Sequence, residues 1–361
     1  MHVLVGLLGA VLVLLMLVEI FVAFLLPRRV KRDPKIVRSV FAYAWGPWRR
    51  VASALPAQAE DTMLGIYGPA GLLLNLVLWV LAMMLGYACL QWAGGSHLAL
   101  AGHAVDFGDD LFFSAATMAS SGTAGLSAHS AFARAVQVVD AGSGLAVIAI
   151  VIGYLPSLYQ AFSRREATVS QLDARAGSPP SAGRLVVRST QRDGWPALNR
   201  YLSGWETWVA ELMETHLAYP VLAYFRSQHV NQNWLSAMCA LLDACAFTIA
   251  AAPPGTVDSA RFTYAIARHA IVDLSYSFHV EPTAPVLDRL PEADLRELLR
   301  QLHEVGVEAG ADLATISKRL TVIRASYEPY INALGERLDL GLPPWLAPEA
   351  PTDNWRTTQW H

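Results

Sequence analysis

Residues 108–125 read Gly-Asp-Asp-Leu-Phe-Phe-Ser-Ala-Ala-Thr-Met-Ala-Ser-Ser-Gly-Thr-Ala-Gly, a short amphipathic segment that ends in a run of small residues. The segment lies between two long apolar stretches, residues 69–93 and 134–162. A short helix followed by an irregular loop is tolerated at membrane depth only where it is buried in protein or lines a water-filled path. This order of segments therefore predicts a pore.

The composition indicates a protein with a membrane part and a soluble part. Of its 361 residues, 54% are hydrophobic and 16% are charged, with a net charge of −3 and a mean hydropathy of +0.33. Such a chain is too apolar for an ordinary soluble protein and too charged to lie wholly in a membrane. The three cysteines lack the spacing of a zinc site or a disulfide framework, so we expect no bound metal and no cofactor.

The first apolar stretch, residues 3–26, is long enough to cross a hydrocarbon core of about 30 Å and contains one charge, Glu19. Four basic residues follow it within 28–32, and two more, Arg164 and Arg165, follow the last apolar stretch. Basic residues mark cytoplasmic loops. The N-terminus is therefore predicted outside, and the C-terminal domain inside, of a multi-pass protein of the cell's inner (plasma) membrane.

The chain divides into five predicted parts. They are a transmembrane helix (1–27), a cytoplasmic, interfacial linker (28–67), a pore domain with two spans (68–163), a helical cytoplasmic domain (164–342) and a tail (343–361). Within the helical domain, residues 177–183 have the composition of a linker, and residues 184–188 are a short strand candidate. Apolar residues at helical spacing then occupy about 195–228, 232–252, 258–278, 292–309 and 313–336.

Residues 234–252 have two interpretations, a fourth span or a buried core helix. Asp243 at the centre would cost about 2.5–3.5 kcal/mol in a membrane, and no basic residues flank the stretch. A core helix is therefore favoured. The predicted fold is an all-α membrane protein with three transmembrane helices, a re-entrant pore helix with a filter loop, and a C-terminal helical cytoplasmic domain.

The string Thr117-Met118-Ala119-Ser120-Ser121-Gly122-Thr123-Ala124-Gly125 resembles the pore loop of tetrameric potassium-type cation channels, Thr-x-x-Thr-Val-Gly-Tyr-Gly-Asp. The resemblance covers residues 69–166 and is to bacterial two-transmembrane potassium-channel-like pores. It implies that four copies surround one axis and that backbone carbonyls replace the hydration shell of K⁺ or Na⁺. The positions matched to the filter are Thr117, Ser120, Ser121, Gly122, Thr123, Ala124 and Gly125.

The outer half of this loop departs from the family pattern. Thr123 stands where the family has a bracing Tyr, and Gly125 where it has an Asp. Ala124 replaces a second Gly, and a left-handed Ala costs about 1–2 kcal/mol. We therefore expect a shortened or widened filter that holds partly hydrated ions with weakened K⁺ selectivity.

Other polar and glycine residues of the apolar part are candidates for pore function. Asp109 and Asp110 lie at the expected start of the pore helix, where capping and cation attraction are equally good interpretations. Asp140 is expected either behind the filter or in the outer vestibule. We expect a structural hydrogen bond between Glu19 and Asn75, on spans 1 and 2.

Three residues of the last span are candidates for a gating hinge. Gly144 lies where inner helices of the related channels often bend, although close helix packing is an equal explanation. Gly153 and Pro156 lie near the inner end, where Pro removes one backbone hydrogen bond.

The predicted function is passive conduction of K⁺, Na⁺ or both through a homotetramer in the lipid bilayer, gated through the cytoplasmic domain. The alternative is a non-conducting membrane receptor or scaffold that retains the channel fold. In the C-terminal domain, His269 and Asp273 share a helical face, but no further metal ligand is identifiable. We expect neither enzymatic activity nor a nucleic-acid partner.

Overall fold

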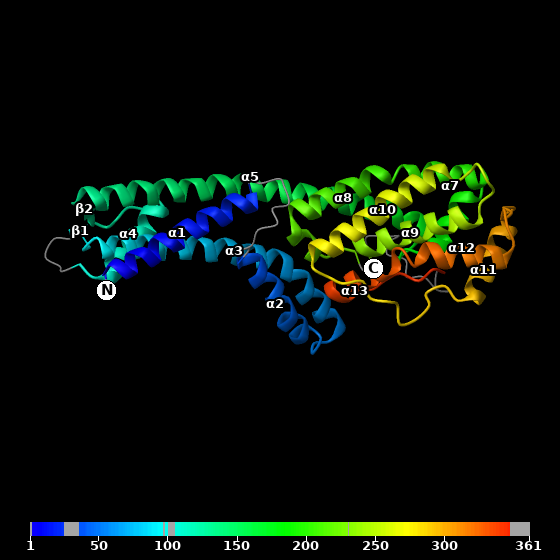
Figure 1. The fold of residues 1–361 in the computed structure, drawn as a ribbon, viewed down its shortest axis with the longest axis horizontal. Coiled ribbons are helices and arrows are strands. Elements are labelled where there is room, and N and C mark those ends of the chain that lie inside the picture. Colours follow the sequence, from blue (N-terminus) through cyan, green and yellow to red (C-terminus); the bar gives the residue numbers. More distant parts are fainter. Residues whose placement is uncertain (1, 25–35, 97, 100–104, 230, 347–361) are drawn as a thin grey trace, which may run out of the picture. The chain divides into compact units, whose positions relative to one another are not determined.

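The computed structural model describes residues 2–24, 36–96, 98–99, 105–229 and 231–346. It contains two compact units, Met1–Tyr159 and Gln160–His361, and the boundary between them falls inside one long helix. Each unit is built almost wholly from α-helices (Figure 1).

The described residues of unit 1 form three long apolar helices, one amphipathic helix, one short helix and two two-residue strands. Its elements are α1 (His2–Phe24), α2 (Ile36–Ala52), α3 (Ala57–Ala93), β1 (Leu98–Ala99), α4 (Phe107–Met118), β2 (Ser127–Ala128) and the first part of α5 (Ala131–Ala176). The two-residue strands β1 and β2 pair antiparallel, with Leu98 opposite Ala128. Because α4 lies between α3 and α5 in the chain, the predicted sequence of apolar helix, short helix, loop and apolar helix is present.

Small residues bring α1 close to α3, along which it runs (Figure 1). A Cβ atom at Gly9 would lie 2.6 Å from the carbonyl oxygen of Gly86, and one at Gly86 would lie 2.7 Å from Cγ2 of Val13. Glycine is thus required for this close approach of two backbones, a common device between apolar helices.

The core of unit 1 joins α1, α3, α4 and α5. Trp79, Met83 and Tyr87 of α3 are buried against Met16 of α1 and Val147 of α5. Outside this core, the helices leave many large apolar side chains exposed. Among them are Leu4, Leu7 and Val11 of α1, Leu74, Leu81 and Leu85 of α3, and Val138, Leu145 and Ile152 of α5. Such surfaces are typical of helices that face hydrocarbon.

The predicted linker at 28–67 is partly wrong, because residues 57–67 belong to the same helix as the second apolar stretch. Pro56 stands immediately before α3 and needs no backbone N–H there. Trp48 of α2 donates its indole N–H to the carbonyl of Met63 over 3.0 Å, and the ring of Trp45 packs on Tyr67. The described residues of this region therefore form a helical hairpin.

Unit 2 is a helical domain built around α9. Besides the end of α5, its elements are α6 (Ala182–Thr190), α7 (Gly194–Ser203), α8 (Glu206–Ala218), the 3₁₀ helix η1 (Pro220–Tyr224), α9 (Trp234–Ala251), α10 (Asp258–Ser277), α11 (Glu292–Glu304), α12 (Leu313–Arg324) and α13 (Glu328–Leu338). Helices α6, α7, α10, α12 and α13 all contact α9. The predicted segments 195–228 and 313–336 are each divided into two α-helices.

Among the described residues, four helices are long and apolar enough to cross a membrane, namely α1, α3, α5 and α9. They differ in how much of their surface protein already covers. The apolar windows of α1, α3 and α5 are 28%, 33% and 28% buried, whereas that of α9 is 94% buried. Helix α9 is therefore packed as a core helix of unit 2.

Two local predictions for unit 2 are wrong. Residues 184–188 form part of α6 and not a strand, and residues 177–183 form a largely buried turn (177–181) and the first two residues of α6 and not a linker. Ser181 stabilises both the helix and the turn. Its hydroxyl accepts a hydrogen bond from Arg184 N (3.3 Å) and donates one to the Trp345 carbonyl (2.9 Å). The first bond caps a helix, and the second fixes the turn against the chain's later part. Of the predicted tail, residues 347–361 lie outside the described residues.

A buried charge network links α9 to the rest of unit 2. Arg289 donates to both carboxylate oxygens of Asp243 at 2.7 Å, and the Tyr327 hydroxyl donates to Asp243 Oδ1 at 2.6 Å. Arg289 also contacts Glu328 at 3.2 Å. Three elements distant in sequence thus meet at one carboxylate.

We expect Asp243→Ala to destabilise unit 2 by about 3–5 kcal/mol, because it leaves the largely buried Arg289 without its main partner. Thermal unfolding of the full chain in detergent can be followed by thiol labelling of Cys239 and Cys245, both on α9, in a Cys89→Ser background. Glu292→Ala, which removes an exposed ion pair with Arg296, is the control and should leave the midpoint unchanged. An equal midpoint for the two variants would contradict a stabilising role for the network.

Candidate functional site

The N-terminus of α4 is fixed by a reciprocal pair of hydrogen bonds. Asp109 N donates to Asp106 Oδ1 over 3.1 Å, and Asp106 N donates to Asp109 Oδ2 over 3.0 Å. This is a capping box, which satisfies two backbone N–H groups at the helix start. Asp109 therefore caps the helix, as one of the two interpretations predicted. Its partner Asp106 was missed, although the spacing Asp-x-x-Asp is the signal that could have found it.

Asp110 is buried at the same end of the helix. Its side chain is 0% exposed and accepts a hydrogen bond of 2.6 Å from the Ser96 hydroxyl, which fastens the segment before β1 to α4. The carboxylate of Asp110 faces the protein interior and not solvent. Its bond to Ser96 helps to hold α4 in place. Attraction of cations by either aspartate stays a prediction.

The C-terminus of α4 ends in a Schellman motif. Ser121 N donates to the Ala116 carbonyl over 3.0 Å, and Ser120 N donates to the Thr117 carbonyl over 3.1 Å. Ser120 has φ +52°, the left-handed conformation that this motif requires just past the helix end. Ser120 was predicted to be part of the ion filter. In the structure, it is also the residue that terminates α4.

The outer part of the loop is closed by a tight turn. Leu126 N donates to the Thr123 carbonyl over 3.0 Å, with Ala124 at φ +49° and Gly125 at φ +90°. Positive φ at both central residues defines a type I′ turn. The Thr123 hydroxyl adds a second bond of 2.6 Å to the Leu126 carbonyl. The turn differs from an extended filter, but it places Ala124 in the left-handed region that the sequence argument expected alanine to avoid.

From the C-cap of α4 to the start of the turn, the backbone carbonyl groups are open. Residues 119–122 are exposed in the single chain, and their carbonyl oxygens accept no hydrogen bond from any described residue. Gly122, at φ +90°, supplies the backbone freedom predicted for it. Four consecutive carbonyl groups are thus available to a ligand such as a cation.

A row of polar side chains lies buried on α4 and on the α5 surface that packs against it. Ser114, Thr117 and Asp140 are 1%, 8% and 2% exposed, and Asp140 lies beside Ser114. Tyr87 of α3 and Ser143 of α5 share a hydrogen bond of 2.6 Å. Asp140 is therefore buried beside α4 in the single chain, and its place relative to a filter or a vestibule stays a prediction. Thr117 lies in the last turn of the helix rather than in the loop.

Gly144 is a close-packing residue. A Cβ atom there would lie 2.3 Å from the Met118 carbonyl oxygen, so only glycine lets α5 approach the end of α4 this closely. Gly153, in contrast, has no atom within 4 Å of such a Cβ, and α5 continues through Pro156 as one helix. Of the two explanations for Gly144, the structure supports packing, while hinge roles for Gly153 and Pro156 stay predictions.

The predicted hydrogen bond between Glu19 and Asn75 is not present among the described residues. Contacts of Gly6 with Ala93 and of Gly9 with Cys89 set the register of α1 against α3. In this register, Glu19 is level with Val80, about five residues or ~7 Å along the helix from Asn75. The sequence estimate failed because it measured depth from an assumed start of span 2 at residue 69, whereas α3 begins at Ala57.

In unit 2, the end of α5 is held by a buried arginine. Arg165 donates to the carbonyls of Leu222 and Phe225, each at 2.8 Å, and to Nε2 of His216 at 3.2 Å. Burial and the adjacent Arg165 guanidinium lower the pKa of His216 to about 3, so this imidazole is neutral and accepts the bond. His269 and Asp273 lie 3.6 Å apart, but no group of three metal ligands occurs in the described residues.

No family model, curated protein sequence or solved structure matches this chain. Its class therefore follows from its own geometry. The part of the chain that the structure describes is helical apart from two two-residue strands and contains four apolar helices of membrane-spanning length. Its candidate site is a capped short helix followed by four open carbonyl groups.

We expect Gly144→Ala to destabilise unit 1 by about 1–3 kcal/mol, because the new methyl group overlaps the end of α4. Gly142→Ala is the matched control on the same helix, since a Cβ at Gly142 meets nothing within 4 Å. The control should be neutral or stabilising, as alanine favours helix. Thermal unfolding in detergent compares the two, and a harmless Gly144→Ala would argue against the packing role.

We expect Ala124→Gly to stabilise the turn by about 1 kcal/mol, because it removes the left-handed alanine. Hydrogen exchange of the Leu126 amide, which closes the turn, should slow. Ala115→Gly inside α4 is the control, and it should speed local exchange because glycine weakens a helix. Faster exchange of Leu126 in Ala124→Gly would show that the turn is not the conformation in the membrane.

Proposed function

We propose that this protein is a homotetrameric membrane channel that conducts K⁺, Na⁺ or both passively, with weak preference for K⁺. The observation that carries the proposal is the row of open carbonyl groups at residues 119–122, placed directly after a short capped helix between two apolar helices. Carbonyl oxygens can replace the hydration shell of a monovalent cation. One such row per chain forms a complete ring only when several copies surround an axis.

The charge distribution around the row favours cations. The C-terminal end of a helix carries a partial negative charge, and in α4 this end adjoins the open carbonyls. Residues 106–128 contain no basic residue, and their three aspartates lie at the opposite, N-terminal end of α4. The same segment would attract cations and repel anions.

The turn at Thr123–Leu126 supports weak selectivity. A long filter strips an ion at several successive carbonyl rings. Here the turn ends the open row after Gly122, and no tyrosine braces it. A short row would leave the ion partly hydrated, so K⁺ and Na⁺ would be separated poorly.

In the proposed topology, α1, α3 and α5 cross the plasma membrane and α4 enters it as a re-entrant helix. The N-terminus would lie outside and unit 2 in the cytoplasm, as the basic clusters after the first and last apolar stretches indicate. The high burial of α9 within unit 2 supports its place in a soluble domain.

Gating through unit 2 would use the fixed end of α5. Because Arg165 binds two carbonyls of the η1 segment and His216 of α8, a movement of these elements would be passed to α5. Gly153 and Pro156 are then the candidates for the bend, since neither is tightly packed in the single chain.

The second candidate function is a non-conducting receptor or scaffold. The closed turn at Thr123–Leu126 favours it, because this turn shortens the row of oxygen ligands to less than the length of a complete filter.

The deciding experiment is ion flux through purified protein in liposomes under opposed K⁺ and Na⁺ gradients. We expect clear current with a reversal potential near zero. A reversal potential near the K⁺ equilibrium value would contradict the weakened filter, and silence from folded oligomers would contradict conduction.

Two sets of variants sharpen this experiment. Ser121→Lys should abolish the current by placing a positive charge in the open row, whereas Ser127→Lys, also at an exposed serine, should conduct. The combined changes Ser120→Thr, Ser121→Val, Thr123→Tyr and Ala124→Gly restore the family filter and should shift the reversal potential toward K⁺. If the restored variant is silent as well, the receptor or scaffold function is favoured.

A further inference from the structure

A buried carboxyl group without a positive partner lies where α5 packs against α4. The side chain of Asp140 is 2% exposed, and its Oδ1 atom has no hydrogen-bond partner in the part of the chain that the structure describes. Beside it lies Ser114 of α4, which is 1% exposed and whose hydroxyl oxygen is unpartnered as well. An isolated ionised carboxylate is among the most costly groups to bury away from water. The site therefore requires either a bound cation or a proton.

Asp243 of unit 2 shows what supports a buried carboxylate elsewhere in this chain. It accepts two hydrogen bonds from Arg289 and one from Tyr327, so a positive charge and a hydroxyl donor both face it. Asp140 has neither an arginine nor a lysine beside it among the described residues, and its one polar neighbour is Ser114. A single hydroxyl donor does not replace the hydration of a full negative charge.

The titratable groups of the surrounding helices supply no countercharge. Tyr87 of α3 is an ordinarily neutral phenol that shares its hydrogen bond with Ser143. Asp110 of α4 and Glu19 of α1 are themselves acidic. Arg134, six residues earlier on α5, is exposed and donates to two carbonyl groups just before this helix. The described part of unit 1 therefore leaves the carboxyl without a cationic side chain.

The site is complete within one chain. Asp140 and Ser114 are already buried before a second copy or a lipid is added, so neither can reach the carboxyl unless α4 and α5 first separate. A metal ion would need several oxygen ligands at this point, whereas Ser114 is the one polar side chain that adjoins the carboxyl in the described residues. A proton needs only one acceptor.

We propose that Asp140 is a proton-binding site that closes the contact between α5 and α4. In the protonated form, its O–H group donates a hydrogen bond to the Ser114 hydroxyl oxygen, so both unpartnered oxygens are satisfied. Loss of the proton leaves a buried negative charge, which is stabilised only when water enters and the two helices part. The contact is thus sensitive to pH, and it does not depend on ion conduction.

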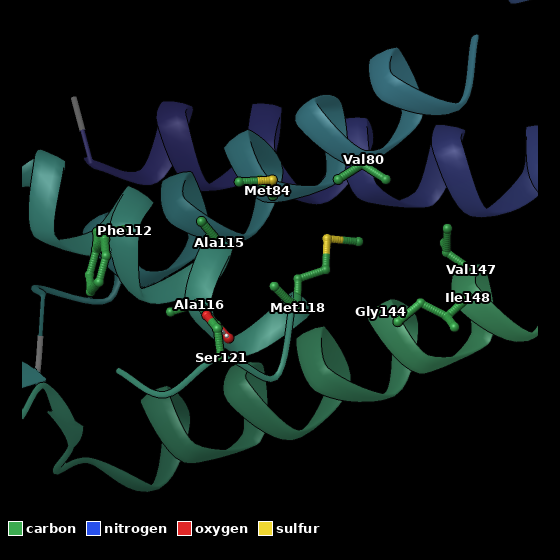
Figure 2. A pocket seen from close by; sticks show the side chains of 11 residues that line it. Val80, Met84, Phe112, Ala115, Ala116, Met118, Ser121, Gly144, Val147 and Ile148 are labelled. Carbon is green, nitrogen blue, oxygen red and sulfur yellow. Dashed lines mark hydrogen bonds between the residues drawn. The ribbon is translucent and has the colours of Figure 1, made fainter. Parts of the chain in front are cut away.

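This contact lies close to the end of α4. Gly144, four residues after Asp140, packs so tightly against the Met118 carbonyl that a Cβ atom would not fit (Figure 2). Ser114 lies one turn before Met118 on α4. Release of the contact would therefore loosen the last turn of α4 and the residues 119–122 that follow it.

The first test is infrared spectroscopy of the full-length protein in lipid vesicles at about pH 6, where exposed carboxyl groups are ionised. A protonated carboxyl group has a C=O stretching band that a carboxylate lacks. We expect this band in the difference between wild type and Asp140→Asn, and we expect it to vanish from the wild type as the pH rises. Asp61→Asn, at an exposed carboxyl of α3, is the control and should remove no such band.

A wild type that lacks the band at about pH 6 would overturn the proposal, as would a carboxylate band that depends on added Na⁺ or K⁺, since a cation would then occupy the site. If Asp140→Asn does not fold, Ser114→Ala identifies the band. This variant keeps the carboxyl but removes its acceptor, so the band should move. A band that stays in place would contradict the bond to Ser114.

The second test is hydrogen exchange of the amides of residues 115–118, corrected for the intrinsic effect of pH. Once the proton has left, exchange in the wild type should become faster by about tenfold or more, because the helix contact opens. Asp140→Asn cannot ionise, and its amide can still donate to Ser114, so its exchange should stay slow. An equal pH dependence in the two proteins would overturn the opening of the contact.

Discussion

The need to satisfy backbone hydrogen bonds away from water is the constraint on which unit 1 depends. Helix α4 is only twelve residues long, and each of its ends would leave orphan groups. The Asp106–Asp109 capping box satisfies orphan N–H groups at the N-terminal end, and the Schellman motif at Ser120 satisfies orphan carbonyl groups at the C-terminal end. The carbonyl groups of residues 119–122 are left without hydrogen bonds even though both ends of α4 are capped. They are therefore part of an ordered backbone and not of a loose loop.

Unit 2 meets the related problem of buried charge. Asp243 sits in the middle of α9, a helix with the length and composition of a membrane span. Its carboxylate is paired by Arg289 and Tyr327, which come from elements that follow α9 in the chain. In lipid these partners would be absent or would themselves have to be buried there. The network therefore explains why such an apolar helix can be the core of a helical domain.

Sequence reasoning succeeded where the signal is local and failed where it is not. Hydropathy and helical spacing predicted the long apolar helices and most helices of unit 2, because both signals repeat within a few residues. The strand predicted at 184–188 failed because Ser181 caps a helix there while bound to Trp345, far along the chain. The Glu19–Asn75 bond failed because the register of two helices is set by the glycines at their contact. The loop was located correctly, but its turn depends on φ angles that residue type alone does not determine.

The strain in the loop shows how firmly its backbone conformation is held. Gly122 and Gly125 adopt positive φ without penalty, whereas Ser120 and Ala124 do so at about 1–2 kcal/mol each. Strain of this kind persists only where the surroundings over-determine the conformation, and it also occurs elsewhere in the chain, for example at Asp339 after α13. Here the two strained residues bracket Ser121 and Gly122, one in the helix cap and the other in the turn. The backbone of Ser121 and Gly122 is therefore fixed from both sides, by the hydrogen bonds of the helix cap and by those of the turn.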